Sequence, residues 1–170
     1  MRPWLPLALT GLVSAPMVAA DLALTIEIPR MNIAEYHPPY VAIWVERSDQ
    51  SVAANLAVWY AAKREKNEGA QWLRDLRQWW RRSGRDLTTP VDGVTGATRT
   101  PGRHELTFSG TTEPMASLPP GSYQLVVEAA REVGGRELLK VPFVWPARAP
   151  TTASAKGATE LGSIAVTVRP

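Results

Sequence analysis

The sequence contains no cysteine and only two histidines among its 170 residues. Without cysteine there is no disulfide, no c-type haem attachment, no cysteine-ligated iron–sulfur cluster and no thiol nucleophile. The histidines, His37 and His104, stand in neither an H-E-x-x-H nor an H-x-x-E-H motif, and no G-x-S-x-G nucleophile elbow is present. A self-contained hydrolase is therefore not expected. A metal site shared by the two histidines stays open as an alternative to two ordinary surface histidines.

The chain also lacks a strong charge of either sign and, beyond its first residues, a long apolar run. Its formal net charge is +3, and the basic residues are scattered apart from one cluster near residues 74–82. A nucleic-acid partner is therefore not expected. No later segment is long and apolar enough to predict a membrane-spanning helix.

The first 20 residues have the order of parts that is typical of a secretory signal. A positive start at residues 1–2 precedes an apolar run at residues 5–13, and the small residues 18–20 precede Asp21. The apolar run is too short to cross a bilayer. We expect cleavage near Ala20 and export to the periplasm. Residues 21–170 would then form a single domain that is not embedded in the membrane.

Short apolar segments, separated by turns rich in proline and glycine, indicate strands along most of the mature chain. The predicted strands cover residues 21–29, 40–45, 56–60, 105–108, 123–129, 138–145 and 161–168. A hairpin turn is expected at residues 133–136, which contain Gly-Gly, and an extended connection at residues 146–156. This pattern predicts a mainly β protein, an antiparallel immunoglobulin-like sandwich of about seven strands.

One segment has the periodicity of a helix instead of a strand. Its apolar residues fall at offsets 0, 1, 4, 7 and 8 and are Trp72, Leu73, Leu76, Trp79 and Trp80. These offsets place all five residues on one face of an α-helix. Basic residues toward the C-terminal end complement the helix dipole. The sequence therefore predicts one inserted amphipathic helix over about residues 69–83, with its tryptophans packed on the sheet.

Residues 85–103 form a predicted loop of 19 residues, which is long for a segment without regular structure. Its centre has the sequence D-G-V-T-G-A-T at residues 92–98. Gly93 and Gly96 permit positive φ angles and close approach by another surface. One interpretation is a tight turn in which Asp92 and Thr95 cap local backbone amides.

The same seven residues resemble the acceptor motif D-x-x-(S/T)-G-A-(T/S) of flavinylated extracytoplasmic proteins. The loop is similar to that of the FMN-binding subunits of ion-pumping respiratory complexes. In those families the last threonine carries FMN through a phosphoester bond, which an ApbE-type flavin transferase makes from FAD with Mg²⁺. The resemblance implies that Thr98 is the FMN acceptor. The implied recognition residues around it are Asp92, Gly93, Thr95, Gly96 and Ala97.

The chain as a whole resembles an uncharacterised family of predicted periplasmic proteins. The resemblance lies in E-I-P-R at residues 27–30, P-Y-V-A-I-W at residues 39–44 and D-L-R-Q-W-W-R at residues 75–81. Members of that family tend to be encoded near flavin transferases and PepSY-type membrane proteins. The resemblance implies a flavin transferase and a membrane-bound electron donor as partners.

These features lead to a hypothesis of a periplasmic flavoprotein that carries electrons and has no substrate of its own. In this hypothesis the isoalloxazine ring could stack on Trp79 or Trp80, although the helical offsets favour packing of both residues on the sheet. Arg81, Arg82 or Arg85 could face the FMN phosphate, guide docking to an acidic partner, or form a solvated face.

Two other hypotheses stay open. The chain could be a cofactor-free immunoglobulin-like binding or adaptor module, in which the loop at residues 92–98 is only a turn. It could also be a metal chaperone that uses His37 and His104, for which the sequence gives weaker support.

Overall fold

The computed structural model describes residues 20–63 and 65–170, and this part of the chain contains nine strands and one helical segment. The predicted signal segment, apart from Ala20, lies outside the described residues. The strands are β1 (Asp21–Ile28), β2 (Tyr40–Glu46), β3 (Val52–Tyr60), β4 (Thr95–Ala97), β5 (Gly102–Ser109), β6 (Gly121–Ala130), β7 (Arg136–Trp145), β8 (Thr151–Lys156) and β9 (Ser163–Arg169). The helical segment consists of the 3₁₀ helix η1 (Glu65–Asp75), the α-helix α1 (Arg77–Arg82) and the 3₁₀ turn η2 (Gly84–Asp86).

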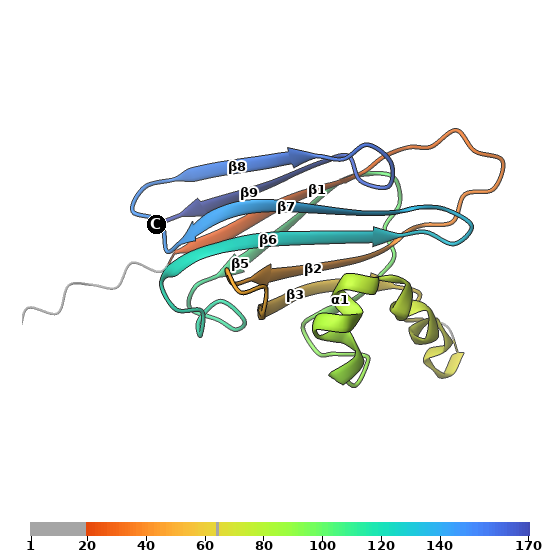
Figure 1. Ribbon diagram of the computed structural model, residues 1–170, viewed down its shortest axis with the longest axis horizontal. Helices are drawn as coiled ribbons and strands as arrows, with labels where there is room; N and C mark the ends of the chain where they lie inside the picture. Colours follow the sequence, from red (N-terminus) through yellow and green to blue (C-terminus); the bar gives the residue numbers. More distant parts are fainter. Residues whose placement is uncertain (1–19, 64) are drawn as a thin grey trace, which may run out of the picture.

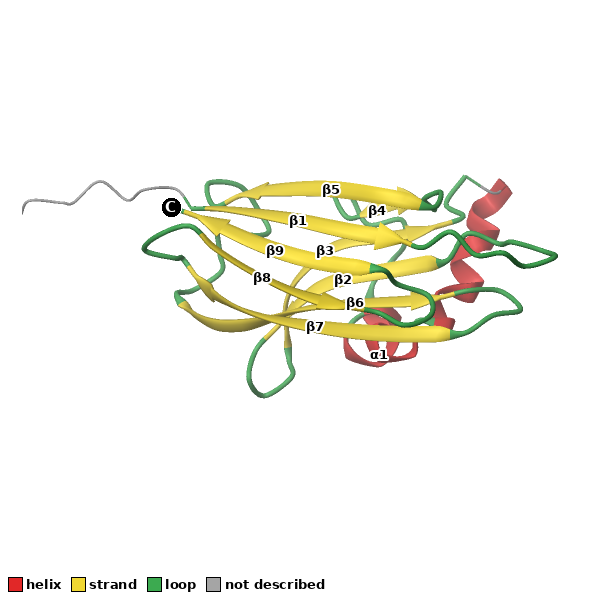
Figure 2. Cartoon of the chain, turned by 90° about the horizontal axis from the view of Figure 1, so that it is seen from above, coloured by secondary structure: helices red, strands yellow, loops and turns green. Residues whose placement is uncertain are grey.

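The strands form two sheets that pack face to face (Figures 1 and 2). The first sheet has the order β5-β1-β9-β8, and the second has the order β4-β3-β2-β6-β7. Strand pairing is antiparallel throughout except between β3 and β4, which run parallel. The predicted mainly β sandwich is therefore confirmed, whereas the prediction of wholly antiparallel sheets is wrong at this edge.

Two strands lie in segments for which the sequence predicted a loop and an extended connection, so the described residues contain nine strands where about seven were expected. β4 lies inside the predicted loop 85–103 and pairs with β3 over three residue pairs. β8 lies inside the predicted connection 146–156, and only its alanines, Ala153 and Ala155, pack against the core. Small and hydroxyl side chains give little contrast between the two faces of a strand, so neither segment has a detectable alternation.

The space between the sheets holds the larger apolar core. β1 contributes alternate residues from Leu22 to Ile28, each no more than 1% exposed. This confirms the strand predicted from their period of two.

A second apolar cluster covers the opposite face of the second sheet, where the helical segment packs (Figure 1). Its buried members among the described residues are Ala42, Trp44, Val58, Tyr60, Leu73, Leu76, Trp79, Val126 and Ala130. Because both faces of this sheet are covered, β2 and β6 are buried almost without interruption. The helical segment is thereby fixed beside the end of β3, close in the chain to the motif at residues 92–98.

The helical segment is not the single helix predicted over residues 69–83. η1 ends at Asp75, and Leu76 has φ −75° and ψ 70°, which interrupts the helix before α1 begins. The interruption lets the backbone N–H of Trp79 donate to buried Glu128 on β6 at 2.8 Å. The prediction was wrong because Leu73 and Leu76 face the sheet in either arrangement, so apolar spacing alone conceals the break.

Candidate functional site

The motif at residues 92–98 is attached to the sheet by backbone hydrogen bonds at both ends of β4. The N–H of Val58 donates to the carbonyl of Val94 at 2.9 Å, and the N–H of Thr98 donates to the carbonyl of Tyr60 at 3.2 Å. These bonds place Thr98 immediately after β4, where β3 ends and the chain continues toward η1.

A tight turn precedes β4, as one interpretation of the sequence predicted. The N–H of Thr95 donates to the carbonyl of Val91 at 2.9 Å, and the Thr95 Oγ1 accepts from the N–H of Val91 at 2.8 Å. Gly93 has φ +69°, a conformation that suits glycine. Asp92 is exposed, and its carboxylate accepts a hydrogen bond from the N–H of Gly93 at 3.0 Å. Thr95 therefore shapes the turn.

Gly96 lets the side chain of Trp59 approach the backbone of β4 closely, as expected from the lack of a side chain at this position. A Cβ atom at this position would lie 3.1 Å from Cδ1 of buried Trp59. The guanidinium of Arg99 lies over the same indole, 5.1 Å from the ring centroid, in a cation–π contact. The backbone of β4 is thus pressed against Trp59, which sets the position of Thr98.

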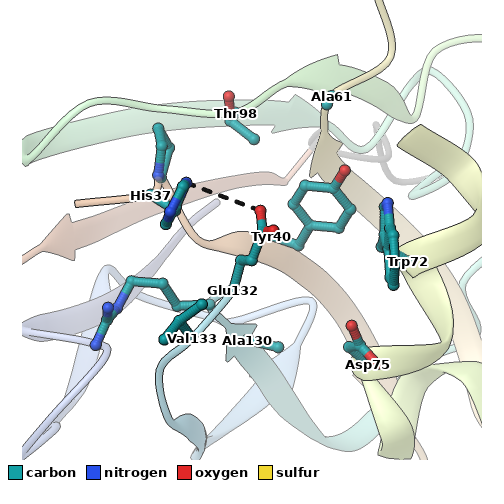
Figure 3. A pocket seen from close by; sticks show the side chains of 11 residues that line it. His37, Tyr40, Ala61, Trp72, Asp75, Thr98, Ala130, Glu132 and Val133 are labelled. Atoms are coloured by element: carbon teal, nitrogen blue, oxygen red, sulfur yellow. Dashed lines mark ion pairs between the residues drawn. The ribbon is translucent and has the colours of Figure 1, made fainter. Parts of the chain in front are cut away.

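Thr98 lines a cavity of about 340 Å³, and Figure 3 shows its side chain on the cavity wall. The side chain is half-buried, and within the described residues its hydroxyl has no hydrogen-bond partner. The other walls come from the end of the loop before β2 and β2 itself, from η1, and from the turn between β6 and β7. Their principal side chains are His37, Tyr40, Trp72, Asp75, Arg131 and Val133.

The aromatic wall of the cavity is formed by Tyr40 and Trp72. The Tyr40 hydroxyl donates to the carbonyl of Gly69 at 3.2 Å, which anchors the β2 end to η1. Trp72 is 44% exposed, although its neighbour Leu73 is fully buried. An aromatic side chain that is left in contact with water beside a cavity offers a flat apolar surface to a ligand.

On the opposite wall, Arg131 is paired with the buried carboxylate of Glu160. Arg131 donates from Nε to Glu160 Oε2 at 2.9 Å and from Nη2 to Glu160 Oε1 at 3.2 Å.

Burial raises the pKa of the nearby Tyr36 hydroxyl, and the positive charge of Arg131 opposes this rise. The Tyr36 hydroxyl is buried and has no hydrogen-bond partner among the described residues.

The tryptophans and arginines proposed from the sequence to hold the cofactor lie outside this cavity. Trp79 is fully buried in the second cluster and donates from Nε1 to Asn55 at 2.9 Å, so its predicted packing on the sheet is confirmed. Trp80 packs partly buried against the same cluster. The arginines make other contacts: Arg81 with Gln78, Arg82 with Gln50 and Arg85 with Asp86.

Sequence reasoning assigned Trp72 to the apolar face of the helix and so missed its place in the cavity.

The two histidines lie on different parts of the fold. His37 lines the cavity and contacts Glu35 at 3.1 Å and Glu132 at 3.8 Å. His104 lies on β5, where its Nε2 is 2.8 Å from the carbonyl of Thr100. The described residues contain no group of three or more histidine or acidic side chains placed to hold a metal.

Comparison with known proteins identifies the family. Within the described residues, no helix is both long and apolar enough to cross a membrane. No curated protein and no solved structure matches the chain. A family model described as "Predicted periplasmic protein (DUF2271)" matches residues 21–163, and this description agrees with the periplasmic localisation predicted from the sequence. The chain therefore belongs to the DUF2271 family of predicted periplasmic proteins.

Proposed function

We propose that this protein carries FMN covalently bound to Thr98 and transfers electrons in the periplasm. A flavin transferase attaches the cofactor, and a membrane-bound donor reduces it. The observation that carries the proposal is the position of Thr98. It is the last residue of a motif that resembles the flavin-acceptor sequence, it lines a cavity with aromatic walls, and its hydroxyl has no hydrogen-bond partner among the described residues.

The attachment requires only the threonine hydroxyl from this chain. The Thr98 Oγ1 attacks the phosphorus on the FMN side of the FAD pyrophosphate, the P–O bond to the AMP phosphate breaks, and AMP leaves. The hydroxyl proton passes to a base of the transferase, which also supplies the Mg²⁺. Once attached, the flavin supplies the electron-transfer chemistry, and the chain orients the ring and limits its contact with water.

The site residues fit this role in two respects. Gly96 and Ala97 put no bulky side chain beside Thr98, so they do not obstruct a transferase. Among the described residues β4 pairs with β3 alone, over three residue pairs, and a short edge strand of this kind can open locally while the rest of the sheet stays paired. Detachment would present residues 92–98 as an extended segment, and re-pairing would return Thr98 to the cavity.

Co-expression of the full-length chain with an exported flavin transferase tests the proposal. We expect the intact mass of the purified protein to rise by one FMN less one water, and the protein band to fluoresce in a denaturing gel. Thr98→Ser keeps a hydroxyl and should retain the adduct, whereas Thr98→Val should lose it. Thr100→Val is the matched control, because Thr100 is an exposed threonine outside the motif.

Two results would contradict the proposal. One is an unchanged mass for the wild-type protein when the same transferase modifies a known acceptor protein. The other is an FMN-sized increment that persists in Thr98→Val.

A cofactor-free immunoglobulin-like binding or adaptor module is the second candidate. The observation in its favour is that Thr95 and Gly96 both have local structural roles, in the turn before β4 and in the contact with Trp59. Those roles account for two motif residues without a cofactor. Absence of the FMN increment would favour this module over the electron carrier.

A further inference from the structure

Exposed apolar side chains are concentrated at the cavity beside Thr98. The described chain has four exposed large hydrophobic residues, and two of them, Trp72 and Val133, line this cavity. Trp72 is 44% exposed and Val133 is 88% exposed. Exposed apolar surface gathered at one hollow indicates a binding site more strongly than the same residues scattered over the molecule.

Val133 is unusual in its backbone as well as its exposure. It has φ +52°, in the left-handed region that β-branched residues rarely adopt. It occupies a turn closed by the N–H of Gly134 and the carbonyl of Arg131, 3.0 Å apart. Glycines occupy the next two positions, yet the residue in the strained conformation is a valine. Strain of this kind is concentrated at ligand sites, and here the strained residue is one that lines the cavity.

The size and lining of the cavity suit a planar heteroaromatic ring. Its volume of about 340 Å³ falls in the range of about 300–1,000 Å³ that is usual for small-molecule sites. In Figure 3, Trp72 lies on one side of the cavity and Val133 on another, with Tyr40 between Trp72 and His37. Asp75 and Arg131 add polar groups, which can meet the polar edge of a ring whose faces contact apolar side chains.

We infer that this cavity receives the isoalloxazine ring of the FMN on Thr98, with Trp72 as its stacking partner and Val133 as a further apolar contact. This inference rests on the proposed function, because Thr98 tethers the ring next to the cavity that it lines. The tether makes docking intramolecular, so a modest stacking interaction is enough to keep the ring in place. Docking also removes the exposed faces of Trp72 and Val133 from water.

The test compares flavinylated wild-type protein with flavinylated Trp72→Leu. In the wild type, the indole quenches the flavin fluorescence, and the fixed ring gives visible circular dichroism. Trp72→Leu keeps an apolar side chain but removes the stacking surface. We expect the ratio of docked to undocked ring to fall by about two- to tenfold, the range expected for loss of an aromatic pair. Fluorescence should rise and circular dichroism should weaken, with the FMN mass increment unchanged.

Two further variants separate ring docking from general effects on the fold. Val133→Gly removes the second apolar contact and relieves the strained φ, so it should weaken docking without lowering the melting temperature. Trp80→Leu removes a tryptophan of α1 that does not line the cavity, and its flavin signals should match the wild type. Equal fluorescence and circular dichroism in wild type and Trp72→Leu would overturn the stacking role.

Failure of the proposed function has a different signature. If no FMN increment forms, flavin attachment at Thr98 is refuted, and the cavity is then tested with free riboflavin. Saturable quenching of riboflavin by the wild-type protein, weakened in Trp72→Leu, would retain the cavity as a flavin-ring site. Absence of saturable quenching by the wild-type protein would overturn the inference as well.

Discussion

Replacement of Glu128 tests whether the helical segment depends on a carboxylate buried beneath it. Glu128 is fully buried and accepts hydrogen bonds from the N–H groups of Gln78 at 3.0 Å and Trp79 at 2.8 Å. It also pairs with Arg136 Nη1 at 3.0 Å. Glu128→Ala leaves all these donors without their acceptor. Arg136 is 42% exposed, so water can solvate it when the carboxylate is gone. The two backbone N–H groups lose a charged acceptor, and a hydrogen bond to a charged group contributes about 1.5–3 kcal/mol, so we expect the free energy of unfolding to fall by about 3–6 kcal/mol.

Urea denaturation followed by tryptophan fluorescence measures this loss, because Trp44 and Trp79 lie in the cluster that the helical segment covers. For a domain of this size, the expected loss lowers the melting temperature by about 6–24 °C. Glu132→Ala is the control, since Glu132 is exposed and its contact with His37 is 3.8 Å long. An exposed pair of this kind contributes about 0–1 kcal/mol. A loss below about 1 kcal/mol in Glu128→Ala would refute the assigned role of the carboxylate.

Three further substitutions probe the fold around the site. Gly84→Ala adds a Cβ only 2.5 Å from Cζ3 of buried Trp79 and should cost about 1–3 kcal/mol of unfolding free energy by urea denaturation. Burial raises the pKa of Glu137, but backbone N–H donors from Ala158, Leu161 and Thr159 lower it by more, so the net pKa is below its ordinary value of 4.5. The free energy of unfolding lost in Glu137→Gln should therefore be greatest above pH 4.5, the ordinary pKa of the group. The loss should vanish as the pH falls through the lower pKa that Glu137 has in the folded protein. Chemical denaturation at several pH values measures this trend. Gly96→Val adds a side chain that crowds Trp59, so it should push β4 away from β3 and weaken the hydrogen bond from the Thr98 N–H to the Tyr60 carbonyl. Hydrogen exchange at the Thr98 amide, followed by mass spectrometry, should then be faster. Unchanged exchange would contradict the contact between Gly96 and Trp59.

The strands whose side chains alternate between apolar and polar could be predicted from the sequence. A strand that is defined only by backbone hydrogen bonds to its neighbour, without such an alternation, could not. Residues of β1 between Leu22 and Ile28 are buried at every second position, so the strand and its inward face follow from the sequence. β4 pairs through three residues of T-G-A, which have no polarity contrast. Its partner and its parallel direction depend on the path of residues 61–94, which no local pattern reveals.

The candidate site was predictable in its motif but not in its surroundings. The sequence singled out residues 92–98, whereas the cavity at Thr98 is assembled from segments that lie far apart in the chain. Trp72 was assigned to the sheet because an α-helix would place it one turn before Leu76 on the same face. In a 3₁₀ helix the residues that share a face are three apart. Leu76 follows η1 directly, and its N–H donates to the carbonyl of Leu73 at 3.1 Å, as in a last 3₁₀ turn. Leu73 and Leu76 are both fully buried against the sheet, whereas Trp72 is rotated off it.

This rotation gives Trp72 a different energetic role from that of the buried tryptophans. In an ordinary core position, replacing tryptophan with a small residue costs about 3–5 kcal/mol. Trp72 is 44% exposed, so Trp72→Gln should change the unfolding free energy of the flavin-free protein by less than about 1 kcal/mol. The same substitution should raise the fluorescence of the flavinylated protein. Denaturation of both forms separates the two effects, because a loss of more than about 2 kcal/mol without flavin would identify Trp72 as a core residue and remove the reason to assign it to a ligand.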